Sequence, residues 1–123
     1  MTAQPGAGTG DRRATVAFVA VVVLSLVVLF SPRAPGGGGI GLDKLVHASL
    51  FALLAATTWW RFAAHRAGLV AVLAYAALSE VAQSLLLASR SGDVRDVCAD
   101  AAGVIVGWIV ARRLSERPSR PAR

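Results

Sequence analysis

With 123 residues, 55% of them hydrophobic, and a mean hydropathy of +0.60, the chain is too apolar for an ordinary water-soluble domain and too short for more than one compact unit. Its net charge of +6 does not indicate nucleic-acid binding, because the arginines gather at the ends of apolar segments. The single cysteine, Cys98, excludes an intrachain disulfide and a cysteine-based zinc site. A small membrane protein with basic flanks explains the composition best.

The first apolar segment, residues 14–30, is long enough for one membrane crossing. As a helix it would measure roughly 26 Å at about 1.5 Å per residue, close to a hydrocarbon core of roughly 30 Å. Residues 1–13, which precede it, have little apolar content, so we expect them to be disordered. The SPRAP sequence that follows lacks a small-x-small cleavage site, which favours a retained anchor over a cleaved signal peptide.

Three further apolar segments follow a connector rich in glycine and proline, residues 31–41. Tryptophans and arginines mark several of their ends, as expected at a membrane–water boundary. The last residues, 114–123, form a basic tail that contains proline, and we expect it to be disordered. The three segments are predicted to span the membrane at about residues 42–60, 67–88 and 94–111.

The predicted fold is all-α: a polytopic bundle of four transmembrane helices, with residues 14–113 as its one domain. The orientation follows from charge, because arginine and lysine accumulate on the cytoplasmic side of membrane proteins. One side of the predicted bundle carries nine arginines and only two acidic residues, Asp11 and Glu116. The arginines are Arg12, Arg13, Arg61, Arg66, Arg112, Arg113, Arg117, Arg120 and Arg123. We therefore expect a multi-pass protein of the bacterial plasma membrane with both termini in the cytoplasm.

Polar residues gather on the opposite, extracytoplasmic side of this arrangement. They lie at the start of the second helix, in the outer half of the third helix, and in the segment that leads into the fourth. We predict that they form a polar pocket in the outer leaflet. Its candidate binding residues are Asp43, Lys44, His47, Glu80, Gln83, Arg90, Asp93, Asp96 and Asp100.

Glu80 lies deepest among these residues, about 12 Å below the end of its helix. An unpaired carboxylate at such a depth costs at least ~2.5–3.5 kcal/mol, so Glu80 must face the bundle interior and acquire a cation or a proton. His47 or Arg90 is the expected partner. The candidates for catalytic residues are His47, Glu80 and Asp96.

Simpler interpretations are open for individual residues. Asp93 and Asp96 can be acidic residues of a first helical turn, opposite the positive end of the helix dipole. Asp43 can be the N-cap of the second helix, and Gln83 can be an interhelical hydrogen-bonding residue. Asp100 lies too far inside an apolar segment for such an interpretation, which favours a functional role.

Small residues recur every fourth position along the fourth helix. A ladder of this kind lets a neighbouring helix approach closely. Asp96 and Asp100 share nearly the same face of that helix at about 100° per residue, so this face is predicted to look inward. The ladder consists of Ala99, Gly103, Gly107 and Ala111.

Four short motifs occur in one order along the apolar segments. They are Asp-Lys-x-x-His at 43–47, Glu-x-x-Gln at 80–83, Arg-x-x-Asp-x-x-Asp at 90–96 and Gly-x-x-x-Gly at 103–107. This ordered set resembles the VanZ-like family, small bacterial membrane proteins named for a teicoplanin-resistance accessory protein. The chain departs from the family pattern at Asp100, where the family usually has Asn, and at LLLASR, which lacks the Pro-Gly that often precedes the family's arginine.

The resemblance implies a role in the cell envelope or in resistance to glycopeptides of the teicoplanin type. We expect an accessory factor that binds an anionic, lipid-linked cell-wall precursor or the glycopeptide itself. Lys44 and Arg90 would hold its phosphate or carboxylate groups. The lipid bilayer is the other expected partner, and we expect neither nucleic acid nor a cofactor or resident metal. The oligomeric state and the substrate stay open.

Two alternatives come from other classes of function. In a membrane enzyme acting on a lipid-linked envelope substrate, His47 and Glu80 would serve as general acid and base. A hard cation on Asp93, Asp96 or Asp100 would then assist. In a structural or interaction subunit, the buried charges would only fix the register of the helices. The sequence leaves open whether the protein is an enzyme.

Overall fold

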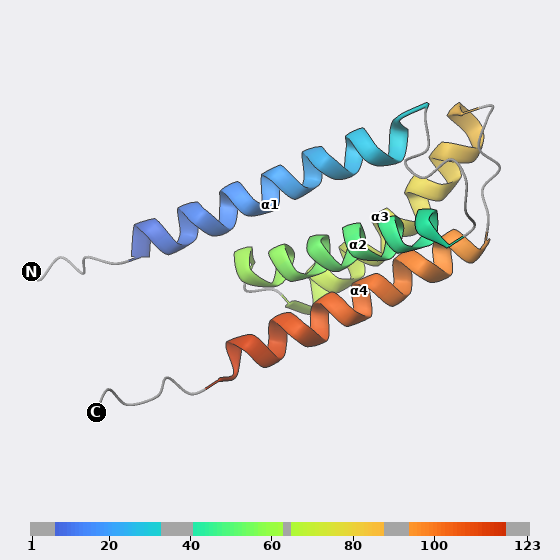
Figure 1. Cartoon of the computed structure of the whole chain (residues 1–123). Coiled ribbons are helices and arrows are strands. Elements are labelled where there is room, and N and C mark those ends of the chain that lie inside the picture. Colours follow the sequence, from blue (N-terminus) through green and yellow to red (C-terminus); the bar gives the residue numbers. More distant parts are fainter. Residues whose placement is uncertain (1–6, 33–40, 63–64, 88–93, 118–123) are drawn as a thin grey trace, which may run out of the picture.

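A computed structural model describes residues 7–32, 41–62, 65–87 and 94–117, and four helices make up almost all of them. They are α1 (Ala7–Phe30), α2 (Leu42–Arg61), α3 (His65–Leu86) and α4 (Val94–Ser115), shown in Figure 1. These residues contain no strand, so the prediction of an all-α chain with four helices is confirmed. The start of α1 and the ends of α2 and α4 lie at one end of the bundle.

The helices extend beyond some of the predicted spans. α1 begins at Ala7, so helix replaces the disorder that the sequence predicted for residues 7–13. The hydroxyl of Thr15 donates to the carbonyl of Asp11 at 2.8 Å, and the carboxylate of Asp11 lies 3.3 Å from the guanidinium of Arg61 at the end of α2. The ion pair holds the polar start of α1 against the end of α2. α4 likewise continues to Ser115.

α2 is the central helix of the bundle. It contacts each of the other three helices, and its contact with α4 is the most extensive in the described part of the chain. Its buried face carries Leu50, Phe51, Leu54 and Ala55, which pack with Leu29 of α1, Val72 and Ala76 of α3 and Val104 of α4. α1 and α4 do not contact each other within the described residues, so α2 holds the bundle together.

The α2–α4 contact depends on the two glycines of the small-residue ladder. A Cβ atom at Gly103 would overlap the backbone carbonyl of Ala48, and one at Gly107 would overlap that of Ala52. The two helix backbones are therefore in direct contact along this face. The prediction that the ladder faces a neighbouring helix is confirmed, and that neighbour is α2.

Large apolar side chains remain exposed along the outside of the bundle. They include Val19, Val27, Leu78, Leu85 and Ile109. Within the described residues, two helices are long and apolar enough to cross a membrane, α1 over Asp11–Phe30 and α3 over His65–Leu86. The charged residues of α2 and α4 lower the hydropathy of these helices, so their membrane crossing stays a prediction. Exposed apolar area of this extent is typical of surfaces that meet lipid or another protein.

Aromatic rings join three helices at the end of the bundle where the arginines gather. Trp59 of α2 stacks on His65 of α3, with ring centroids 3.7 Å apart and an interplanar angle of 8°. Trp59 also meets Trp108 of α4 edge to face at 4.7 Å, and its indole N–H donates to the hydroxyl of Ser115 at 3.0 Å. These contacts fix this end of α2 against both neighbours.

The close α2–α4 contact yields a prediction for Gly103→Ala. Alanine favours a helix over glycine by about 1 kcal/mol, yet the added methyl group must push α2 and α4 apart. We expect a net loss of about 1–3 kcal/mol of stability. Thermal unfolding in detergent, followed by circular dichroism, measures it. The matched control is Gly41→Ala, where a Cβ atom meets no atom within 4 Å. Equal melting temperatures for the two variants would contradict the prediction.

Candidate functional site: a buried histidine and carboxylate cluster

Three helices bring six of the predicted site residues together near the starts of α2 and α4. We call this group the polar cluster. α2 contributes three of its members, α3 one and α4 two. The members are Asp43, Lys44, His47, Glu80, Asp96 and Asp100.

His47 is the centre of the cluster. Its Nδ1 lies 2.9 Å from Oδ1 of Asp100 on α4, at hydrogen-bond distance, and 3.7 Å from Oε1 of Glu80 on α3. All three side chains are buried: His47 and Glu80 are 2% and 5% exposed, and Asp100 is 0% exposed. One imidazole thus links the three helices. The sequence predicted either His47 or Arg90 as the partner of Glu80, and His47 is the residue that lies beside it.

The glycine contact between α2 and α4 explains why His47 and Asp100 can meet. Gly103 follows Asp100 by three residues, so it lies on nearly the same face of α4. It rests against the backbone of Ala48, the residue after His47. Because the two backbones touch at this level, the short side chain of Asp100 can reach the imidazole. A larger residue at position 103 would push the two groups apart.

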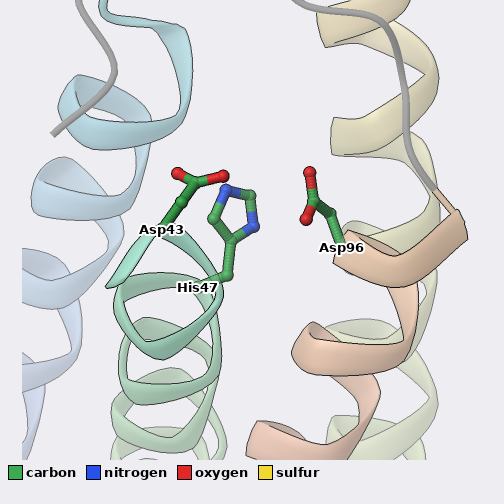
Figure 2. A group of neighbouring side chains, drawn as sticks. All are labelled: Asp43, His47 and Asp96. Atoms are coloured by element: carbon green, nitrogen blue, oxygen red, sulfur yellow. The ribbon is translucent and has the colours of Figure 1, made fainter. Parts of the chain in front are cut away.

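A second, more accessible layer of the cluster lies above His47. Nζ of Lys44 pairs with Oδ1 of Asp96 at 2.5 Å, and these side chains are 27% and 16% exposed. Figure 2 shows the imidazole of His47 between the carboxylates of Asp43 and Asp96, with one ring nitrogen facing Asp43. Ligand atoms of Asp43, His47 and Asp96 lie within 4.8 Å of one another. The cluster therefore has a buried floor and a partly exposed rim.

Some carboxylate oxygens in the cluster are buried and accept no hydrogen bond from the described residues. Oδ2 of Asp100 and Oδ1 of Asp43 are among them. The interpretation of Asp43 as an N-cap is wrong, because Gly41 occupies the cap position and makes no side-chain cap bond. Asp43 instead lies in the first turn of α2, where its carboxylate is directed to the cluster.

Gln83 lies outside the polar cluster. Its side-chain amide donates to the backbone carbonyl of Leu29 at 2.6 Å, so it joins α3 to α1. A second α1–α3 contact is the 3.0 Å hydrogen bond between the hydroxyls of Ser25 and Tyr75. The interhelical interpretation of Gln83 therefore matches its contacts. The pairing of Ser25 with Tyr75 was not predicted, because a serine within an apolar segment gives no sign of its partner.

Two predicted site residues, Arg90 and Asp93, lie outside the described residues. Two described serines of α3 bond within their own helix. Ser79 donates to the carbonyl of Ala76 at 2.9 Å, and Ser84 donates to that of Val81 at 2.7 Å. Neither serine is thus arranged as a nucleophile beside a base. The chemistry that the cluster offers is proton exchange between imidazole and carboxylate, or the binding of a cation.

An apolar cavity of about 470 Å³ lies between α1, α2 and α3, apart from the polar cluster. Phe18, Leu54, Phe62, Val72 and Tyr75 contribute to its walls. Its lining carries almost no polar side chain, so it cannot supply the acid–base chemistry of the cluster. The candidate site is therefore the cluster.

Buried ionisable groups inside a small bundle of apolar helices define an all-α protein with membrane character. The chain belongs to the VanZ/LLP1 family, whose pattern it matches over residues 12–115. This confirms the resemblance that the motifs indicated. No curated protein and no solved structure gave a significant match. The family and the geometry of the cluster are thus the two bases for a functional proposal.

The buried contact of His47 with Asp100 predicts strong energetic coupling. Removing one partner of a buried charged pair typically costs about 3–5 kcal/mol, because the other charge stays buried. We expect His47→Ala and Asp100→Ala each to lose stability on this scale, and the double variant to lose much less than their sum. Unfolding by denaturant in mixed micelles measures the stability of the wild type, the two single variants and the double variant, which together form a double-mutant cycle.

The exposed pair formed by Arg112 and Glu116, 2.8 Å apart, provides the control for this cycle. Solvent screens that pair, so its two alanine variants should show no measurable coupling. Additive losses at His47 and Asp100 would contradict the prediction.

Proposed function

We propose that the protein is a multi-pass membrane protein that acts in the cell envelope, as an accessory factor in envelope function or glycopeptide resistance. One observation carries the proposal: ionisable side chains from three helices face inward at one end of the bundle, around His47. Surface carboxylates that served only solubility would face outward. Family membership supports the same class of protein.

The distribution of charge supports an extracytoplasmic position for the polar cluster. Most arginines of the described residues lie at the end of the bundle where α1 begins and α4 ends (Figure 1). The acidic cluster lies at the other end, together with Arg95 of the first turn of α4. Positive charge is retained on the cytoplasmic side during insertion. Both termini then lie in the cytoplasm, and the cluster opens toward the outer leaflet.

Lys44 gives the cluster a means of holding an anionic ligand. Its ammonium group pairs with Asp96 at the partly exposed rim. A phosphate or carboxylate from a lipid-linked cell-wall precursor, or from a glycopeptide, can share that ammonium by a charge-assisted hydrogen bond. Arg90, three residues before Asp93 in the motif that resembles the family, would add a second cation.

An enzyme is the second candidate function, and the buried His47–Asp100 contact favours it. A carboxylate that holds an imidazole in one orientation is an arrangement suited to general acid–base catalysis. His47 would exchange a proton with a substrate that enters from the rim, and Glu80 would act as the second carboxylate. A purely structural role, in which the charges fix helix register, is the remaining alternative.

The proposed orientation predicts which positions a membrane-impermeant thiol reagent reaches in intact cells. In a Cys98→Ser background, Gly41→Cys at the start of α2 should be labelled. Arg117→Cys, past the end of α4, should react only after the cells are permeabilised. Both positions are exposed, so accessibility within the fold does not bias the comparison. Labelling of Arg117→Cys alone in intact cells would overturn the orientation.

The proposed function predicts a loss of glycopeptide tolerance when the cluster is changed. Lys44→Met and His47→Gln should lower the inhibitory concentration of a teicoplanin-type glycopeptide to that of cells without the chain. The control is Asp11→Asn, which removes an ion pair at the arginine end of the bundle, where an exposed pair contributes only about 0–1 kcal/mol.

Membrane abundance must be measured together with this phenotype. Loss of tolerance at normal abundance supports a functional cluster. Tolerance that falls in step with abundance supports the structural alternative. Wild-type tolerance in both cluster variants at normal abundance would contradict the proposal.

A further inference from the structure

We propose that His47, Glu80 and Asp100 form a binding site for a divalent transition-metal ion, with Zn²⁺ as the best fit. These residues come from α2, α3 and α4, and each offers one ligand atom. The three ligand atoms lie within 4.8 Å of one another, and all three residues are buried. The sequence led us to expect no resident metal.

The two distances from His47 to the carboxylates are close to those between ligands around one small ion. Zinc binds histidine nitrogen and carboxylate oxygen at about 2.0–2.2 Å, so neighbouring ligand atoms in a tetrahedral site lie roughly 3.3–3.6 Å apart. Nδ1 of His47 is 2.9 Å from Oδ1 of Asp100 and 3.7 Å from Oε1 of Glu80. Both distances are within a few tenths of an ångström of this spacing, so small shifts of the two carboxylates would bring each to the distance from His47 that an ion requires.

Asp100 supplies a second, independent indication of a ligand. Its side chain is fully buried, and its Oδ2 accepts no hydrogen bond from the described residues. A buried acceptor without a partner typically costs about 1–3 kcal/mol, and more when it is charged. A divalent ion on this carboxylate would remove that cost. The hydrogen bond to His47 alone leaves half of the carboxylate without a partner.

Asp43 is placed as an outer partner of the proposed ligand His47. Nδ1 is the ring nitrogen near Asp100, and the other ring nitrogen faces the carboxylate of Asp43. Histidines that bind a metal through one nitrogen commonly direct the other N–H to a carboxylate, which fixes the tautomer and the ring orientation. Asp43 is a positioning residue in this arrangement.

A second triad, Asp43, His47 and Asp96, has similar spacing but suits an ion less well. The carboxylate of Asp96 is already paired with the ammonium of Lys44 at 2.5 Å. An ion there would have to displace that ammonium, and it would be partly exposed to solvent. The geometry therefore favours the inner triad, and the outer residues line the way to it.

The donor set selects the class of ion. One imidazole and two carboxylates suit Zn²⁺ or Mn²⁺ better than Mg²⁺ or Ca²⁺, which prefer oxygen ligands alone. For the same ligands, affinity rises from Mn²⁺ to Zn²⁺. Three protein ligands also leave a coordination position for an oxygen atom of a bound phosphate or carboxylate.

A metal ion at this site would take part in the proposed envelope function. The side of the membrane from which the ion enters rests on that proposed function. Within the polar cluster four carboxylates accompany Lys44 and His47, so an anionic ligand would meet mostly negative charge. A divalent ion would become the largest local charge and would reverse this balance. The envelope ligand and the ion then belong to one site.

Equilibrium dialysis of the full chain in detergent tests the site. After treatment with a chelator and its removal, the protein is dialysed against Zn²⁺, Mn²⁺, Mg²⁺ or Ca²⁺, and bound metal is counted per chain. We expect one Zn²⁺ per chain, weaker binding of Mn²⁺, and a higher melting temperature with Zn²⁺. Asp100→Asn and Glu80→Gln should each weaken Zn²⁺ binding by about tenfold or more.

The matched control is Glu116→Gln, which removes the same charge one residue past the far end of α4, outside the polar cluster, and should keep Zn²⁺ affinity near wild type. Circular dichroism identifies variants that fold, and either Asp100→Asn or Glu80→Gln suffices for the comparison. Zinc bound at less than one ion per chain, or lost equally in Glu116→Gln, would overturn the proposal. Because dialysis needs no cellular phenotype, failure of this test leaves the glycopeptide experiment to decide the proposed function separately.

Discussion

The direct contact between the backbones of α2 and α4 is the constraint on which the rest of the structure depends. Gly103 and Gly107 have no side chain, so the carbonyls of Ala48 and Ala52 lie against α4. That contact sets the register of the two helices, and the register brings His47 next to Asp100. Helix association in lipid gains little from the hydrophobic effect, so close packing of this kind is its principal source of stability. The same glycines thus stabilise the fold and assemble the cluster.

The cluster opposes this stabilisation, because burying carboxylates among apolar helices costs free energy. The structure limits the cost by pairing: Asp100 with His47 in the floor, and Asp96 with Lys44 at the rim. Replacing such pairs with apolar residues is often neutral or stabilising, so stability alone does not explain them. The concentration of these groups around one imidazole, rather than along the whole bundle, favours a role in binding or proton exchange.

The helices and much of the cluster could be predicted from the sequence, and the reasons are physical. Apolar segments of membrane length and a ladder of small residues are local patterns, and they can be recognised in one sequence. The contacts of Gln83 and Asp43 depend on how each helix is rotated and how far it is shifted along its neighbour. Hence Gln83 bonds to α1, and Asp43 turns to the cluster instead of capping α2. The helical start of α1 was missed because its partner, Arg61, is far away along the chain.

The contacts between the helices show which of them build the polar cluster and which does not. α2, α3 and α4 supply every described member of the polar cluster, and the stacked rings of Trp59 and His65, with Trp108, fix the same three helices at the arginine end. α1 is joined to α3 by two polar contacts, at Gln83 and Tyr75, and it borders an apolar cavity. Three helices held at both ends resist relative rotation, so distances around His47 stay defined.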